Sequence, residues 1–172
     1  MGKSAKSRRA GEEYHPWSTY IAAREEARRR GDRKVGTEHL LVALLDDPAL
    51  ASAVGSDAEG ARLALDAMDR EALVAIGMDV PPEVPPLPAG DPREVPARPT
   101  IRTVLHKRLR LTPCAANVLR DSAKGMRRGH RHPGSQHVLA AILELQRPDP
   151  AADLLATLGV EPAVVRERLA DV

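Results

Sequence analysis

Histidine and cysteine are the residue types in this chain best suited to acid–base, nucleophilic or metal chemistry, and the chain holds six histidines and one cysteine. His130, His132 and His137 lie close together in the sequence, but a structural zinc site takes four ligands and Cys114 is the only thiol. No Gly-x-Ser-x-Gly motif is present to activate a serine. We therefore expect no metal ion, no cofactor and no catalytic residue.

Two histidines and the cysteine also have structural interpretations. His39 and His137 each follow a glycine by three residues and precede a row of apolar residues, so we expect them to bond the backbone or neighbouring caps. Cys114 follows a proline in the first turn of an expected helix, where the positive helix end can lower the pKa of a thiol. The same position suits a small packing residue, and we favour packing.

Two polar tetrapeptides begin predicted helices, Gly36-Thr37-Glu38-His39 and Gly134-Ser135-Gln136-His137. Ser and Thr cap helices by accepting hydrogen bonds from free backbone amides, so we expect Thr37 and Ser135 to be caps. The amides of a helix start also favour anionic groups. The sequence therefore predicts partner-binding residues at both starts, namely Thr37, Glu38, Ser135 and Gln136.

Apolar periodicity and capping residues predict that these starts belong to a chain of short helices. We expect helices over residues 17–30, 37–46, 61–67, 71–76, 112–128, 135–145 and 150–158, and a last one from 162 onward. Asp57 and Asp69 are the expected caps of the third and fourth helices. In the first helix, Tyr20, Ala23 and Ala27 form the expected inward stripe, together with Trp17, Ile21 and Ala22 on the next row.

Prolines divide the chain. Eight of the 15 fall within residues 79–100, which excludes a helix and predicts an extended, semi-rigid linker, with a ligand for a proline-recognising domain as the alternative. Residues 1–13 are polar and basic without a pattern, so we expect a disordered tail. The two units on either side of this linker are residues 14–78 and 101–172.

The two units repeat each other. The offset of 98 residues between His39 and His137 also superimposes Gly36 on Gly134 and the apolar run that follows, and the second unit has six extra residues further on. Each unit is too small to bury both of its faces alone. We therefore expect one all-α domain, a pseudo-twofold bundle of two four-helix repeats with about eight helices.

The repeated motif resembles a known family. Gly-Thr-Glu-His-Leu-Leu-x-Ala-Leu-Leu at residues 36–45, with its echo at residues 134–143, is similar to the twin repeats of the Clp N-terminal domain in ClpA, ClpB and ClpC unfoldases. The resemblance covers about residues 14–77 and 110–171. It implies a non-enzymatic module of the Clp proteolytic system that binds substrate peptides, proteins or adaptors, either as an accessory to an unfoldase or in competition with one.

The resemblance also implies a possible ligand. In the ClpC branch the domain is a receptor for phosphorylated arginine, whose guanidinium contacts the Glu of the Gly-Thr-Glu-His motif. Glu38 matches that residue, whereas Gln136 is neutral, so at most one such site is expected. The alternative for Glu38 is a first-turn acid that stabilises its own helix. No Gly-x-x-x-x-Gly-Lys-Ser/Thr loop is present, so we expect no ATP.

Charge and cysteine usage bound the other possibilities. The formal net charge is only +2, but residues 3–9 and 102–131 are basic, so a DNA-associated regulatory protein is the alternative function. Nucleic acid remains the less favoured partner, because the aromatic residues that could stack on bases all lie in one short segment, residues 14–20. A single cysteine and the lack of a long apolar run predict a cytoplasmic protein without membrane contact.

Overall fold

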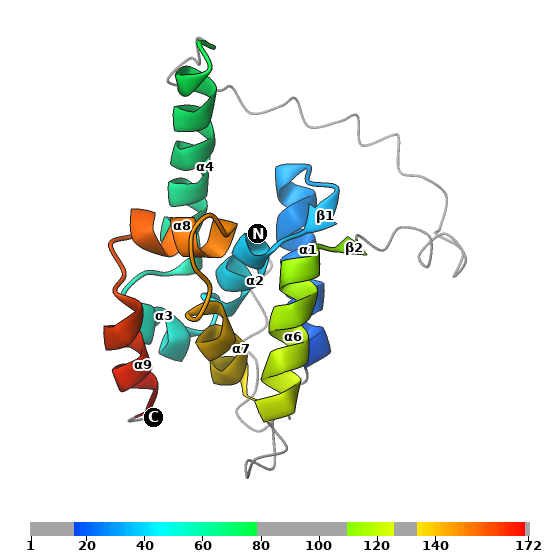
Figure 1. The fold of residues 1–172 in the computed structure, drawn as a ribbon, viewed down its shortest axis with the longest axis vertical. Helices are drawn as coiled ribbons and strands as arrows, with labels where there is room; N and C mark the ends of the chain where they lie inside the picture. Colours follow the sequence, from blue (N-terminus) through cyan, green and yellow to red (C-terminus); the bar gives the residue numbers. More distant parts are fainter. Residues whose placement is uncertain (1–15, 79–109, 126–133, 171–172) are drawn as a thin grey trace, which may run out of the picture.

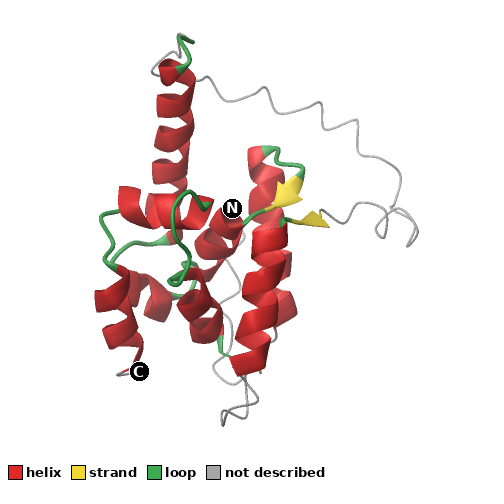
Figure 2. Ribbon diagram, in the orientation of Figure 1, coloured by secondary structure: helices red, strands yellow, loops and turns green. Residues whose placement is uncertain are grey.

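Short α-helices make up nearly all of the structure, a computed structural model that describes residues 16–78, 110–125 and 134–170. The fold is all-α, as predicted, with eight helices in those residues (Figures 1 and 2). The predicted tail and Pro-rich linker lie outside the described residues, as does most of the basic stretch 102–131. The helices are α1 (Pro16–Arg30), α2 (Thr37–Leu44), α3 (Pro48–Val54), α4 (Ala58–Ala75), α6 (Pro113–Gly125), α7 (Ser135–Ile142), α8 (Pro150–Thr157) and α9 (Pro162–Ala170).

The helix order repeats, since α1 to α4 are echoed by α6 to α9. Helices α2 and α7 both have eight residues and both follow a glycine. Helices α3 and α8 both begin with a proline that follows an aspartate cap. Asp47 accepts the Ala49 N–H and Asp149 accepts the Ala151 N–H, each at 3.0 Å. The two halves therefore share a local architecture, as their sequences predict.

The two halves interleave instead of packing as separate bodies. Helix α2 packs against α1 of its own half and against α7 and α8 of the other, while α3 packs on α9 and α4 on α8. The Arg168 guanidinium donates to the Ala53 carbonyl at 2.9 Å and so links α9 to α3. One apolar cluster draws on both halves, and its fully buried members include Leu40, Leu41, Leu139, Ile142 and Leu154.

A short parallel strand pair was not foreseen. β1 (Lys34–Val35) pairs with β2 (Arg110–Leu111), and the Thr112 N–H donates to the Val35 carbonyl at 2.9 Å. Two-residue strands are too short to show an alternating apolar pattern, which explains why the sequence does not reveal them. The pair fixes the start of α6 beside the start of α2.

Asp69 is not a helix cap, which corrects the prediction of two helices in this region. Helix α4 is continuous over 18 residues and is capped by Asp57, whose carboxylate accepts the Gly60 N–H at 2.8 Å. Asp69 lies within the helix and forms an ion pair with Arg30 of α1, as does Asp66. No Gly or Pro interrupts residues 61–75, so the helix has no local reason to end at Asp69.

Candidate functional site at the start of α2

The start of α2 is organised by a buried histidine. Gly36 occupies the N-cap position with extended backbone angles, and its N–H donates to Nδ1 of His39 at 3.0 Å. Nε2 of His39 lies 3.0 Å from Oδ2 of Asp32. With Nδ1 acting as acceptor, neutral His39 carries its proton on Nε2 and donates it to Asp32. The imidazole, which is 1% exposed, therefore ties the helix start to the preceding loop.

The start of α7 has the same design. Gly134 is the N-cap residue, and its N–H donates to Nδ1 of His137 at 3.1 Å. The two histidines therefore bond the backbone, as predicted. His137 is half-buried, however, whereas His39 is buried.

The predicted capping roles of Thr37 and Ser135 are wrong. Both are the first helical residues, one position after the glycine cap, and neither start has a side-chain hydrogen bond from the cap residue. Thr37 is 1% exposed and its hydroxyl donates to Oδ1 of Asp149 at 2.7 Å, 112 positions along the chain. Thr37 therefore lies in the interior, while Ser135 is half-buried.

Glu38 folds back over Gly36. A Cβ atom at Gly36 would overlap both carboxylate oxygens of Glu38, so the residue at that position must be glycine for this carboxylate to keep its place. Its Oε2 is buried without a hydrogen-bond partner among the described residues. Its Oε1 lies 3.0 Å from Nδ1 of His39, which has no proton to offer in the neutral tautomer described above. Oε2 of Glu38, whose side chain is 17% exposed, therefore lacks a hydrogen-bond donor within the described part of the chain.

Gln136 takes the corresponding position with less confinement. Its side chain also lies over the preceding glycine, where a Cβ atom at Gly134 would be 3.2 Å from Cδ of Gln136. Gln136 is exposed, whereas Glu38 is half-buried. The two helix starts are therefore alike in backbone and histidine, and they differ in the charge and burial of this residue.

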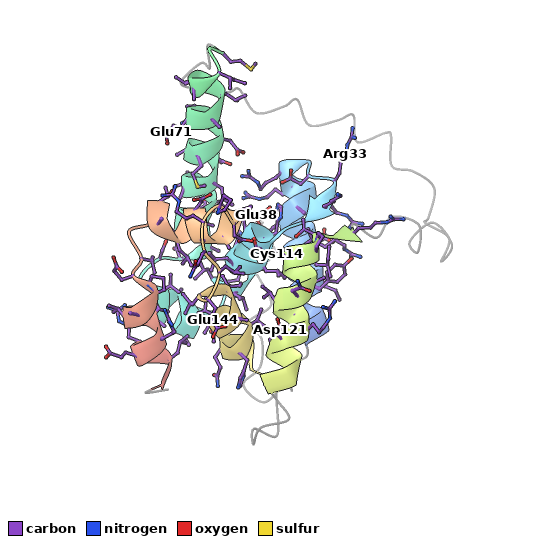
Figure 3. The ribbon with its side chains drawn as sticks, viewed as in Figure 1. Arg33, Glu38, Glu71, Cys114, Asp121 and Glu144 are labelled. Atoms are coloured by element: carbon purple, nitrogen blue, oxygen red, sulfur yellow. The ribbon has the colours of Figure 1, made fainter. Side chains whose placement is uncertain are left out.

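Asp149 is a functional candidate that the sequence analysis missed. Its carboxylate accepts the Thr37 hydroxyl and caps α8 through the Ala151 N–H. A hydrogen bond to Asp149, burial, and the charge of Asp149 together raise the pKa of the Cys114 thiol to about 11. The starts of α2, α6 and α8 thus meet at one carboxylate. Glu38 of α2 and Cys114 of α6 are labelled in Figure 3. The Asp-Pro pair at 149–150 indicates the helix cap, but it does not indicate that Asp149 contacts Thr37 and Cys114.

The raised pKa of the Cys114 thiol disfavours an activated thiolate at neutral pH. A helix start would lower the pKa of the thiol, but the nearby Asp149 carboxylate outweighs that effect.

In the described ranges, no group of three or more His, Cys, Asp or Glu side chains is arranged to hold a metal ion. The helices of these ranges also include none with the length and apolar character to cross a membrane. The arrangement at α2 is suited to binding a positively charged group beside Glu38.

A groove in the second half is a further feature. It lies between the α7–α8 connection and the start of α9, in the region of the extra residues of that half, and is lined mainly by apolar side chains, including Leu145, Leu155, Val160 and Pro162. The charged residues that line the groove are Arg147 and Glu161. Arg147 forms an ion pair with Asp153.

Comparison with models of known protein families gives no match, and a search of curated proteins finds no match to the sequence.

Proposed function

We propose that this protein is a non-enzymatic module that binds peptide or protein segments in the Clp proteolytic system, assisting an unfoldase or competing for its ligands. The observation that carries the proposal is the half-buried carboxylate of Glu38, which is folded over Gly36 and whose buried Oε2 has no hydrogen-bond donor among the described residues. The resemblance of this helix start and its repeat to the Clp N-terminal domain supports the same function.

A guanidinium group fits this carboxylate. Burying a charged oxygen without a donor is unfavourable, so a ligand that supplies N–H groups relieves a cost already present in the free protein. Arginine offers five N–H donors in a planar fork, and a hydrogen bond that involves a charged group contributes about 1.5–3 kcal/mol. The Asp32 carboxylate lies near the same imidazole and adds negative charge. We therefore take arginine-containing peptides, phosphorylated on arginine or not, as the ligands to test.

The second repeat provides an internal control. Gln136 offers a neutral amide oxygen at an exposed position, where water already satisfies its hydrogen bonds. The proposal therefore assigns one arginine site to each chain, at α2, and none of comparable strength to α7.

Replacing Glu38 with glutamine is expected to weaken binding of a phosphoarginine peptide by about ten- to a hundredfold, because the charge is lost while the shape is kept. Isothermal titration calorimetry with that peptide and its unmodified arginine form gives the affinity and the number of sites. The matched control is Gln136→Ala, which should leave both unchanged.

Two results would count against this proposal. If the wild-type protein binds neither peptide, the arginine site is wrong. If Gln136→Ala weakens binding as much as Glu38→Gln, the site is not at α2. The wider assignment is tested separately by crosslinking and pull-down from the native cytosol, in which Clp components or their substrates are the expected partners.

A further inference from the structure

The groove of the second half is lined by residues that have no counterpart in the first half. The connection between α2 and α3 has three residues, 45–47, whereas the connection between α7 and α8 has seven, 143–149. Part of the groove lining comes from this longer connection, namely Leu145, Gln146 and Arg147. The groove is therefore specific to the second half, just as the carboxylate of Glu38 is specific to the first.

The groove has the size and the lining of a ligand site. Its volume is about 570 Å³, within the range of roughly 300–1,000 Å³ that is usual for pockets that hold small ligands. Leu145 and Val160 are only half-buried, so part of the apolar lining remains in contact with water. An apolar side chain that enters the groove leaves water together with this lining, which is favourable.

The groove lies close to the start of α2. Asp149 is the last residue of the connection that lines the groove, and its carboxylate accepts the hydroxyl hydrogen of Thr37, the neighbour of Glu38. Helices α2 and α8 pack against each other, and Figure 3 shows Glu38 near one end of α8. Chain geometry across this hydrogen bond places the backbones of Glu38 and Arg147 at most about 20 Å apart. An extended peptide spans that distance with about six residues.

The charges at the two places favour the same kind of ligand. Arg147 at the groove forms an ion pair with Asp153, whereas Glu161 is exposed and has no ion pair among the described residues. Glu38 has no Lys or Arg partner in the described ranges either. A peptide with a positive charge is therefore attracted at both places, and an acidic peptide is repelled.

We propose that one peptide occupies both places, with an arginine at Glu38 and a large aliphatic side chain in the groove, about six residues apart or fewer. This inference rests on the arginine site of the proposed function and adds a second residue that the ligand must contain. The first half contributes the charge and the second half contributes the apolar surface. The ligands are thus peptides that combine arginine with Leu, Ile, Val or Met.

Synthetic peptides test this pairing on the full-length chain. Each peptide carries one arginine, phosphorylated or not, and one leucine placed about two to eight residues to either side in a Gly-Ser background. The matched peptide has serine in place of the leucine. At the best spacing the leucine should lower the Kd roughly ten- to a hundredfold, because its side chain leaves water for the groove. Fluorescence anisotropy with labelled peptides gives the Kd.

Replacing Ala156 with phenylalanine should remove the gain from the leucine and leave the affinity for the serine peptide unchanged. Ala156 lines the groove and is exposed, so the larger side chain fills the groove without disturbing the core. The matched control is Ala163→Phe, an equally exposed position on α9 that is outside the groove lining. The control should keep the gain, and both variants should keep the wild-type circular dichroism and melting temperature. Glu38→Gln should weaken the leucine and serine peptides by the same factor.

Each failure has its own pattern. A leucine that gives no gain at any spacing overturns the inference, whether the groove is unsuited or already covered by another segment of the chain. Binding of the serine peptide that depends on Glu38 would then still support the arginine site. A gain that survives Ala156→Phe, or that Ala163→Phe removes equally, places the leucine outside the groove and also overturns the inference. If the leucine tightens binding but Glu38→Gln weakens neither peptide, the arginine site fails and the pairing fails with it.

Discussion

Replacing His39 with alanine should lower the free energy of unfolding by about 3 kcal/mol, because it removes one buried and one partly buried hydrogen bond and leaves a cavity. The Gly36 N–H would lose its acceptor at Nδ1, and Asp32 would lose the Nε2 donor. The imidazole is only 1% exposed, so water cannot replace the bond to the Gly36 N–H without opening the structure, whereas Asp32 is 47% exposed and can bond water. Urea denaturation followed by circular dichroism gives the change.

The repeat supplies the matched control for this prediction. His137→Ala removes the equivalent bond to the Gly134 N–H, but His137 is half-buried and water can take its place, so the expected loss is about 1 kcal/mol. His39→Gln should recover part of the stability, since a glutamine three residues after the cap can accept the cap N–H. Equal losses of unfolding free energy in the two alanine variants would contradict the claim that the burial of His39 makes its hydrogen bonds more important than those of His137.

Replacing Asp149 with asparagine should make Cys114 react about tenfold faster with iodoacetamide at pH 8. The charge of Asp149 and its hydrogen bond help to hold the thiol pKa at about 11, so only a small fraction is thiolate at that pH. Without the charge, the pKa should fall towards the ordinary 9.0. The thiolate fraction then rises by up to about a hundredfold, and the lower nucleophilicity of a more acidic thiol reduces that gain by about tenfold.

The measurement is the alkylation rate as a function of pH, in which the midpoint should move to lower pH in the Asp149→Asn protein. Asparagine still accepts hydrogen bonds at a helix cap, so α8 should remain capped. Asp47→Asn is the control, because Asp47 caps α3 in the same way within the first half. If Asp47→Asn accelerates the reaction equally, the effect arises from general loosening and not from the charge beside Cys114.

Local features of the fold were predictable from the sequence. Asp57 and Thr112 act as the caps that their residue types indicate, with Thr112 Oγ1 accepting the Ala115 N–H at 3.2 Å. Tyr20, Ala23 and Ala27 of the expected stripe are buried, as its period predicts, whereas Ile21, which was also expected to face inward, is 41% exposed. These features depend on residues within one or two helical turns, and the motif at the helix starts occurs in both repeats.

Features that depend on distant contacts were missed or misassigned. Thr37 resembles a cap in sequence, but its hydroxyl is taken by Asp149, and the cap N–H is taken by His39. Asp69 also resembles a cap, yet it lies inside α4 opposite Arg30. Of the candidate site, the sequence indicated Glu38 and Gln136 but gave no sign that Glu38 would be confined against Gly36 or that Asp149 would join three helices.

The interleaving of the two halves has a consequence for synthesis on the ribosome. Helix α2, which holds the buried Leu40 and Leu41, packs partly against α7 and α8, which are translated long after α2 itself. At about 5–20 residues per second, the first half waits several seconds for the helices that complete its core. During that interval the nascent chain exposes apolar residues of α2 that are buried in the folded protein. A chaperone that binds the emerging first half is therefore expected to matter more for the yield of this protein than for its final stability.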